Sequence, residues 1–208
     1  DVINAVKYAE NAKDGLIRIY PEQKTEFEQN FKIYRDSLME LHEWVHNQIQ
    51  RIPESHRYLV TSHDAFQYYG RQYGIELVAL LGTTTDAEIQ TSDVLRVNKI
   101  IKEKELPAIF IESTINPKLM KQLAQDNNVQ IGGELFADSL SDKDGPASSY
   151  IKMIKHNTNT IVQALRSKNI SDAKQTNDNS TKTLLYWLIP LLIMIFGLSI
   201  FFISRSKS

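Results

Sequence analysis

The chain has 208 residues, of which 42% are hydrophobic and 24% are charged, as is ordinary for a globular protein. Its 24 basic and 25 acidic residues leave a formal net charge of −1, so there is no basic excess to neutralise the phosphates of a nucleic acid. The chain contains no cysteine, which excludes disulfides, thiolate-bound zinc and thiol catalysis.

Two helices are predicted at the start of the chain. Apolar residues recur every three or four positions over residues 1–19, and Pro21 interrupts this pattern where a second helix could begin. The second helix is expected over residues 22–52, because the same spacing continues without Gly or Pro until Pro53. At 1.5 Å per residue it would be about 45 Å long, far longer than an average helix.

Short apolar runs then alternate with helical patterns. Strands are expected at residues 57–61, 76–81, 107–112 and 129–132, and helices at 64–73, 91–104, 117–127 and 147–166. This alternation predicts an α/β fold, in which a four-stranded, mainly parallel sheet is flanked by helices. Ligands of such sheets bind beyond the carboxyl ends of the strands, so chemistry is expected just after each strand.

The end of the chain indicates a membrane helix behind a polar stalk. Residues 168–182 are polar and predict a flexible stalk. Residues 183–203 carry no charge and match the ~20 apolar residues that a helix needs to cross a bilayer, so a transmembrane helix is predicted over 183–204. Arg205 and Lys207 follow. The positive-inside rule therefore predicts a single-pass protein of the cell membrane, with residues 205–208 in the cytoplasm and the folded part outside it.

Three side chains are candidates for chemistry at the strand ends. His63 follows the first expected strand, Glu112 ends the third, and Asp138 lies in the loop after the fourth. One imidazole with one or two carboxylates suits manganese, zinc or ferrous iron. The spacing leaves a simpler interpretation open, in which His63 is a hydrogen-bonded loop residue and Asp138 caps a turn.

A second pattern, HEWVH at residues 42–46, matches the zinc-protease motif. In that motif two histidines four residues apart bind zinc and the glutamate acts as a base, which would give these roles to His42, His46 and Glu43. No third ligand is evident nearby, and both histidines lie beside the apolar stripe of the long helix. A protease is therefore the less favoured alternative.

Several segments in order resemble one known family. They are TSHDAFQYYGRQYGIE, TTTDAEIQTSDV, AIFIESTINPKL, GGELFADSL and SYIKMIKHNTNTIVQALR. Together they resemble the C-terminal lobe of the zinc- and manganese-binding solute receptors of bacterial ABC importers, over residues 1–167. The resemblance implies that residues 1–20 end an N-terminal lobe, that 21–53 are the helix connecting two lobes, and that 54–167 are the metal-binding lobe.

The same resemblance implies a set of ligands. Four side chains bind the metal in this family, and the matching positions here are His63 and Asp138. Two further histidines would come from the N-terminal lobe, which this chain does not contain. The glutamate at the strand end is not a usual ligand, so Glu112 is expected to orient a ligating histidine without touching the metal.

The implied function is the capture of zinc or manganese, with iron also compatible, and its delivery to the permease of an ABC importer. No enzymatic activity is expected. The alternative is a cell-surface adhesion protein of the same fold. A C-terminal helical tether departs from the family, in which many members carry an N-terminal lipid or float in the periplasm.

Overall fold

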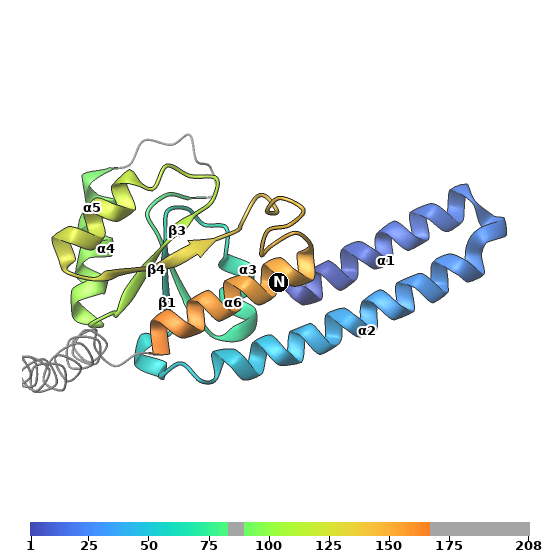
Figure 1. Ribbon diagram of the computed structural model, residues 1–208, viewed down its shortest axis with the longest axis horizontal. Coiled ribbons are helices and arrows are strands. Elements are labelled where there is room, and N and C mark those ends of the chain that lie inside the picture. The colour runs from blue at the N-terminus through green and yellow to red at the C-terminus, as the bar shows by residue number, and fades with distance from the viewer. Residues whose placement is uncertain (83–89, 167–208) are drawn as a thin grey trace, which may run out of the picture. The chain divides into compact units, whose positions relative to one another are not determined.

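The computed structural model describes residues 1–82 and 90–166 (Figure 1). The chain divides into two compact units, Asp1–Ser167 and Lys168–Ser208. The predicted stalk, transmembrane helix and basic tail all lie in the second unit, outside the described residues. Within the two described ranges, no helix is long and apolar enough to cross a membrane.

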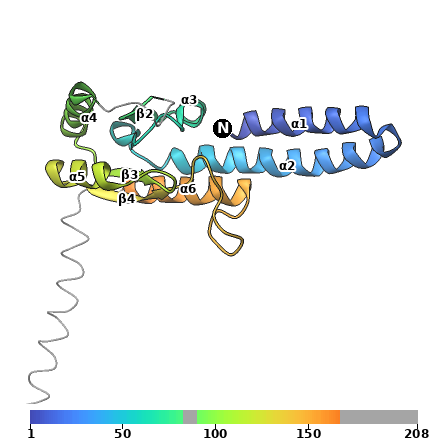
Figure 2. The same ribbon diagram turned by 90° about the horizontal axis from the view of Figure 1, so that it is seen from above.

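The first unit begins with a hairpin of two long helices, which lie side by side (Figure 1 and Figure 2). They are α1 (Val2–Ile19) and α2 (Lys24–Ile49), joined by the short 3-10 helix η1 (Pro21–Gln23). Asp1 caps α1, because its carboxylate accepts the N–H of Ile3 at 2.8 Å. Both predicted helices are confirmed, but α2 ends before residue 52: the N–H groups of Arg51 and Ile52 bond three residues back and tighten the chain into a turn.

The strands and helices predicted between residues 57 and 166 are all present, most of them with shifted ends. The strands are β1 (Tyr58–Thr61), β2 (Glu76–Ala79), β3 (Ala108–Glu112) and β4 (Gln130–Leu135). The helices are α3 (Gln67–Tyr73), α4 (Thr91–Glu103), α5 (Lys118–Asn127) and α6 (Tyr150–Arg166), and a 3-10 helix, η2 (Glu54–His56), precedes β1. Helices α3 and α6 each begin three residues later than predicted, because loops occupy the preceding positions.

The strands form two parallel pairs. β1 pairs with β2 and β3 pairs with β4, so the parallel arrangement is as predicted. β1 and β3 lie next to each other, but among the described residues no hydrogen-bonded ladder joins them. The single four-stranded sheet is therefore not confirmed. The two pairs are instead bridged at their carboxyl ends by the Glu112 side chain, which accepts N–H groups that follow β1.

Two glycines produce an irregularity in β4. The register between β3 and β4 shifts after Ile109, so that Gly132 and Gly133 lie opposite a single residue of β3. Gly133 has a φ of 143°, and a Cβ there would lie 2.5 Å from Cγ2 of Thr160 on α6. The bulge lies where α6 packs closely against β4, five residues before Asp138.

Helices cover both faces of the strands, and a hydrophobic cluster fills each face. Neighbouring strand residues alternate between the two clusters: Leu59 and Phe110 face one, while Val60 and Ile109 face the other. The first cluster includes residues of α2, α3 and α6, and the second includes residues of α4 and α5. The strands that end at the candidate residues, β1 and β3, are thus held between two packed hydrophobic clusters.

Candidate metal centre

The three candidate side chains meet at the carboxyl ends of β1 and β3. Nδ1 of His63 is in close contact with Oε2 of Glu112, and Nε2 of His63 lies 3.2 Å from Oδ2 of Asp138. The imidazole therefore stands between two carboxylates. His63 and Glu112 are buried, whereas the Asp138 side chain is 57% exposed. The structure brings together all three residues that the sequence singled out.

Glu112 fixes both the backbone and the ring of His63. While Oε2 contacts the ring, Oε1 accepts the N–H of Ser62 at 2.7 Å and the N–H of His63 at 3.2 Å. The carbonyl oxygen of His63 also accepts the Thr61 hydroxyl at 2.9 Å. Burial raises the pKa of the Glu112 carboxyl, an effect that His63 and the two N–H groups oppose. With Nδ1 turned to Glu112, Nε2 is the ring nitrogen that faces Asp138.

The chain is held by side-chain bonds at Phe136, two residues before Asp138. The N–H of Phe136 donates to Oδ1 of Asn157 at 3.0 Å, and Nδ2 of Asn157 donates to the carbonyl oxygen of Phe136 at 2.7 Å. The sequence did not single out Asn157. A signal was present, because Asn157 lies on the same helical stripe as the buried Ile154 and Ile161 of α6.

The gap between Nε2 of His63 and Oδ2 of Asp138 suits a shared metal ion. Two ligand atoms that each lie ~2.0–2.2 Å from a tetrahedral ion are about 3.4 Å apart. The observed separation is 3.2 Å. No group of three or more His, Cys, Asp or Glu side chains in the described ranges is arranged to hold a metal ion. The residues that the structure describes therefore offer two facing candidate ligand atoms and not a complete cage.

The HEWVH segment forms no comparable group. Nδ1 of His42 lies 3.1 Å from the hydroxyl of Tyr73, which is a buried residue of α3. His46 and Glu43 are exposed on α2. Among the described residues these side chains gain no third protein ligand, so the structure does not support the zinc-protease interpretation.

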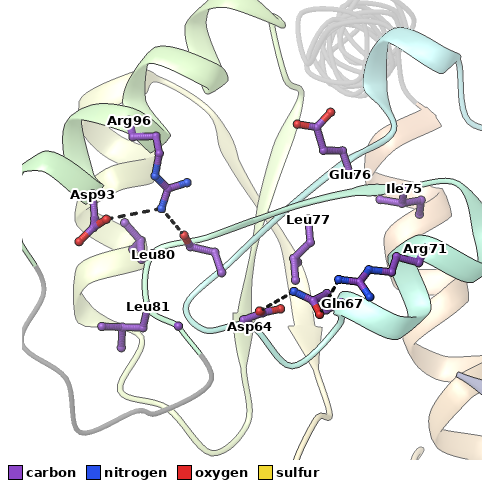
Figure 3. Close-up of a pocket in the computed structure, with 12 residues that line it drawn as sticks. Asp64, Gln67, Arg71, Ile75, Glu76, Leu77, Leu80, Leu81, Asp93 and Arg96 are labelled. Atoms are coloured by element: carbon purple, nitrogen blue, oxygen red, sulfur yellow. Dashed lines mark hydrogen bonds and ion pairs between the residues drawn. The ribbon is translucent and has the colours of Figure 1, made fainter.

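A cavity of about 530 Å³ lies beside β2, between α3 and α4, and is separate from this centre (Figure 3). Asp64 follows His63 in the chain, but its carboxylate turns to this cavity and accepts from Gln67 at 3.1 Å. On the other side, Arg96 donates to the carbonyl oxygen of Ala79 at 2.7 Å. None of the three candidate metal-centre residues lines the cavity.

Comparison with known families gives one match over most of the chain. Residues 1–164 match the family model described as the periplasmic component A of a zinc-uptake complex. The match covers the α1–α2 hairpin and the strands and helices that form the candidate centre.

Individual relatives agree with this match. The chain is 36% identical over 165 residues to the manganese-binding lipoprotein MntA of Halalkalibacterium halodurans, covering 79% of this chain and 55% of the relative. It is 39% identical over 157 residues to the zinc-binding protein TroA of Treponema pallidum, covering 73% and 51%. The solved structure of that periplasmic TroA superposes with a TM-score of 0.77 at 36% identity, covering 80% of this chain and 62% of TroA. The chain thus spans about half the length of the curated relatives it matches.

Proposed function

Because the chain belongs to the family of periplasmic zinc-uptake components, we propose that it is the C-terminal lobe and connecting helix of a metal receptor. The receptor captures a divalent transition metal outside the cytoplasm and delivers it to the permease of an ABC importer. Relatives named as manganese-, zinc- and iron-binding support this class of cargo without singling out one ion. The observation that carries the proposal is the His63 imidazole, held between Glu112 and Asp138.

In this proposal His63 and Asp138 bind the ion directly. His63 uses Nε2, while its Nδ1–H faces the Glu112 carboxylate, which selects the tautomer and increases the basicity of the ligating nitrogen. Asp138 supplies a charged oxygen from the exposed side. A tetrahedral ion takes four ligands, so the remaining two come from another part of the protein, where the family resemblance places two histidines. The isolated residues 1–167 should then bind zinc only weakly.

The test is a titration of the full-length protein with zinc and with manganese. His63→Ala should abolish high-affinity binding of both ions, because it removes a ligand and leaves Glu112 buried without its partner. His46→Ala is the matched control, since it removes an exposed histidine of α2 and should leave the affinity unchanged. An unchanged affinity in His63→Ala would contradict the proposal.

We also propose that residues 183–204 anchor the receptor as one transmembrane helix, with the folded part outside the cytoplasm. The support is the uncharged run of 183–203 followed by Arg205 and Lys207. The relative MntA is named a lipoprotein, so this tether would be a different means of attachment. A chain ending at Lys182 should leave the membrane fraction; retention there would contradict the tether. The alternative role in adhesion stays a prediction.

A further inference from the structure

Two consecutive residues of α6 reach the two segments that carry the proposed ligands. Asn157 bonds to the main chain of the β4–α6 loop, and Thr158 bonds to α3, the helix that follows His63. We propose that Asn157 and Thr158 are positioning residues that set the separation of Asp138 from His63, and thereby the affinity for the metal. This inference rests on the proposed function, because it takes His63 and Asp138 as the ligands.

The Asn157 side chain makes the stronger of these two connections. It is 1% exposed, and its amide both accepts from and donates to the backbone of Phe136. A planar amide that makes both bonds to one residue fixes the orientation of that peptide as well as its position. Nearby, Nε2 of His156 lies 3.2 Å from the carbonyl oxygen of Glu134. The His156 ring also packs edge-on against the Phe136 ring, with 5.3 Å between the ring centroids. The chain is therefore fixed until two residues before Asp138.

The Thr158 connection reaches the other ligand. Its hydroxyl lies 2.9 Å from the hydroxyl of Tyr69, and both residues are buried. Tyr69 packs edge-on against Phe66 at the start of α3, three residues after His63. Adjacent helix residues point about 100° apart, so one helix can hold two segments on different sides. α6 is thus a common support for the His63 turn and the Asp138 loop.

The Asp138 side chain has little else to hold it. Its contact with His63 is the one polar contact recorded for it in the parts of the chain that the structure describes. The loop that carries Asp138 can therefore pack in place while the carboxylate itself is displaced from the position of the ion. Groups that contact a metal ligand directly change metal affinity by about 10–100-fold, and Asn157 acts through Phe136, so its loss should have an effect at the lower end of that range.

The first test is Asn157→Ala in the full-length protein, with the zinc and manganese affinities measured by competition with a chelator. We expect about tenfold weaker binding. Asn159→Ala is the matched control, because Asn159 is an exposed asparagine on the same helix and its loss should leave the affinity unchanged. An Asn157→Ala protein that is folded at the assay temperature and binds like wild type would overturn the proposal.

A double-mutant cycle separates positioning from a general structural effect. If Asn157 acts through Asp138, Asn157→Ala should weaken binding in the wild-type background and have no further effect in an Asp138→Ala background. An equal loss in both backgrounds would overturn the proposal. If Asp138→Ala itself left affinity unchanged, the ligand assignment and the proposed function would fail; if Asp138→Ala weakened binding but Asn157→Ala did not, only the present inference would fail.

Thr158→Val supplies an independent arm, because valine has a shape similar to threonine and the variant should fold even if Asn157→Ala does not. We expect the affinity to fall severalfold, and we expect no further loss when Tyr69→Phe is added, since both changes remove the same hydrogen bond. Asn159→Ala again serves as the control on the same helix. If Thr158→Val bound the metal with wild-type affinity, the bond from Thr158 to α3 would play no part in positioning the ligands, and that half of the proposal would be overturned.

Discussion

His63 and Asp138 face each other across the candidate centre, yet the protein holds them in opposite ways. His63 is 3% exposed, and the Glu112 carboxylate contacts both its ring and its backbone. The Asp138 side chain is 57% exposed and contacts His63, and in the described ranges the chain before it is held by bonds between Phe136 and Asn157. One proposed ligand is therefore fixed at the carboxyl ends of the strands, and the other is carried by a loop.

Because of this difference, part of the entropy lost in organising the site is lost during folding and part during metal binding. The backbone and ring of His63 lose their freedom when the protein folds, so that cost belongs to the free energy of folding. In the proposed site, the exposed carboxylate of Asp138 would become ordered only when the ion binds, so the cost of ordering it would make binding less favourable. If the chain is part of a receptor that must also release its cargo, as proposed, one fixed ligand and one that can withdraw would suit that role. The comparison predicts that changes on the His63 side alter both stability and affinity, whereas changes to Asp138 alter affinity alone.

The largest combined effect is expected from Glu112→Ala. This change leaves the buried N–H groups of Ser62 and His63 without their acceptor, which should lower the free energy of unfolding by about 2–4 kcal/mol. Zinc affinity should also fall by about 10–100-fold, because the ring loses the group that orients it. Chemical denaturation and chelator competition measure the two quantities. A variant that lost affinity at wild-type stability would show that Glu112 does not fix the turn.

Glu112→Gln refines this test. The amide oxygen can still accept the two N–H groups, so stability should stay close to that of the wild type. The amide nitrogen would then face Nδ1 of His63 as a donor and favour the tautomer with hydrogen on Nε2. That hydrogen occupies the nitrogen that would bind the ion, so affinity should fall while stability is kept. Equal affinity in the Gln and wild-type proteins would argue against tautomer control.

Asp138→Ala tests the other side of the comparison. The side chain is exposed and makes no backbone contact in the described ranges, so the free energy of unfolding should change by less than about 0.5 kcal/mol. Zinc affinity should fall by more than the loss of an outer contact would cause, because a ligand atom is removed. Asp144→Ala removes an exposed carboxylate from the same loop and should leave both quantities unchanged. A strong loss of stability in Asp138→Ala would contradict the expected difference, in which only the His63 side contributes to folding.

The two sides of the centre were also unequally visible in the sequence. His63 and Glu112 follow from the alternation of strands and helices, because the carboxyl ends of neighbouring parallel strands meet at one edge. Asp138 was also a candidate from its place in the loop after the fourth strand, but the choice of Asp138 over Glu112 as the ligand came from the family resemblance. The helical stripe of α6 could have marked Asn157 as a buried polar residue, but its partner is the backbone of Phe136, and a backbone partner has no signature in residue type.

The split of the sheet could not be predicted for a related reason. Apolar runs report that a strand is buried, and they do not report which neighbour it bonds to. β1 and β3 both read as buried strands, and both are, yet the group that joins their carboxyl ends is the side chain of Glu112. Sequence patterns thus located the elements within a few residues, while the polar contacts that join them required the structure.

The smallest effect is expected at the start of α6, where Tyr150 donates to the carbonyl oxygen of Asp1 at 3.0 Å. Burial raises the pKa of the Tyr150 hydroxyl from 10.0 to about 12. A raised pKa favours the neutral group in the folded state, so this contribution to stability is complete below pH 10 and is lost as the pH rises toward 12. Burial also raises the pKa of Tyr69 and Tyr73, which act in the same direction.

Tyr150→Phe should therefore make the alkaline loss of stability shallower without abolishing it, as measured by denaturation between pH 9 and pH 12. At neutral pH the zinc affinity should remain that of the wild type, because Tyr150 bonds to the start of α1 and not to either ligand segment. This outcome would confine the influence of α6 on the metal to Asn157 and Thr158. A weaker affinity in Tyr150→Phe would mean that any loosening of α6 displaces Asp138, and that the loop depends on the whole helix and not on two of its side chains.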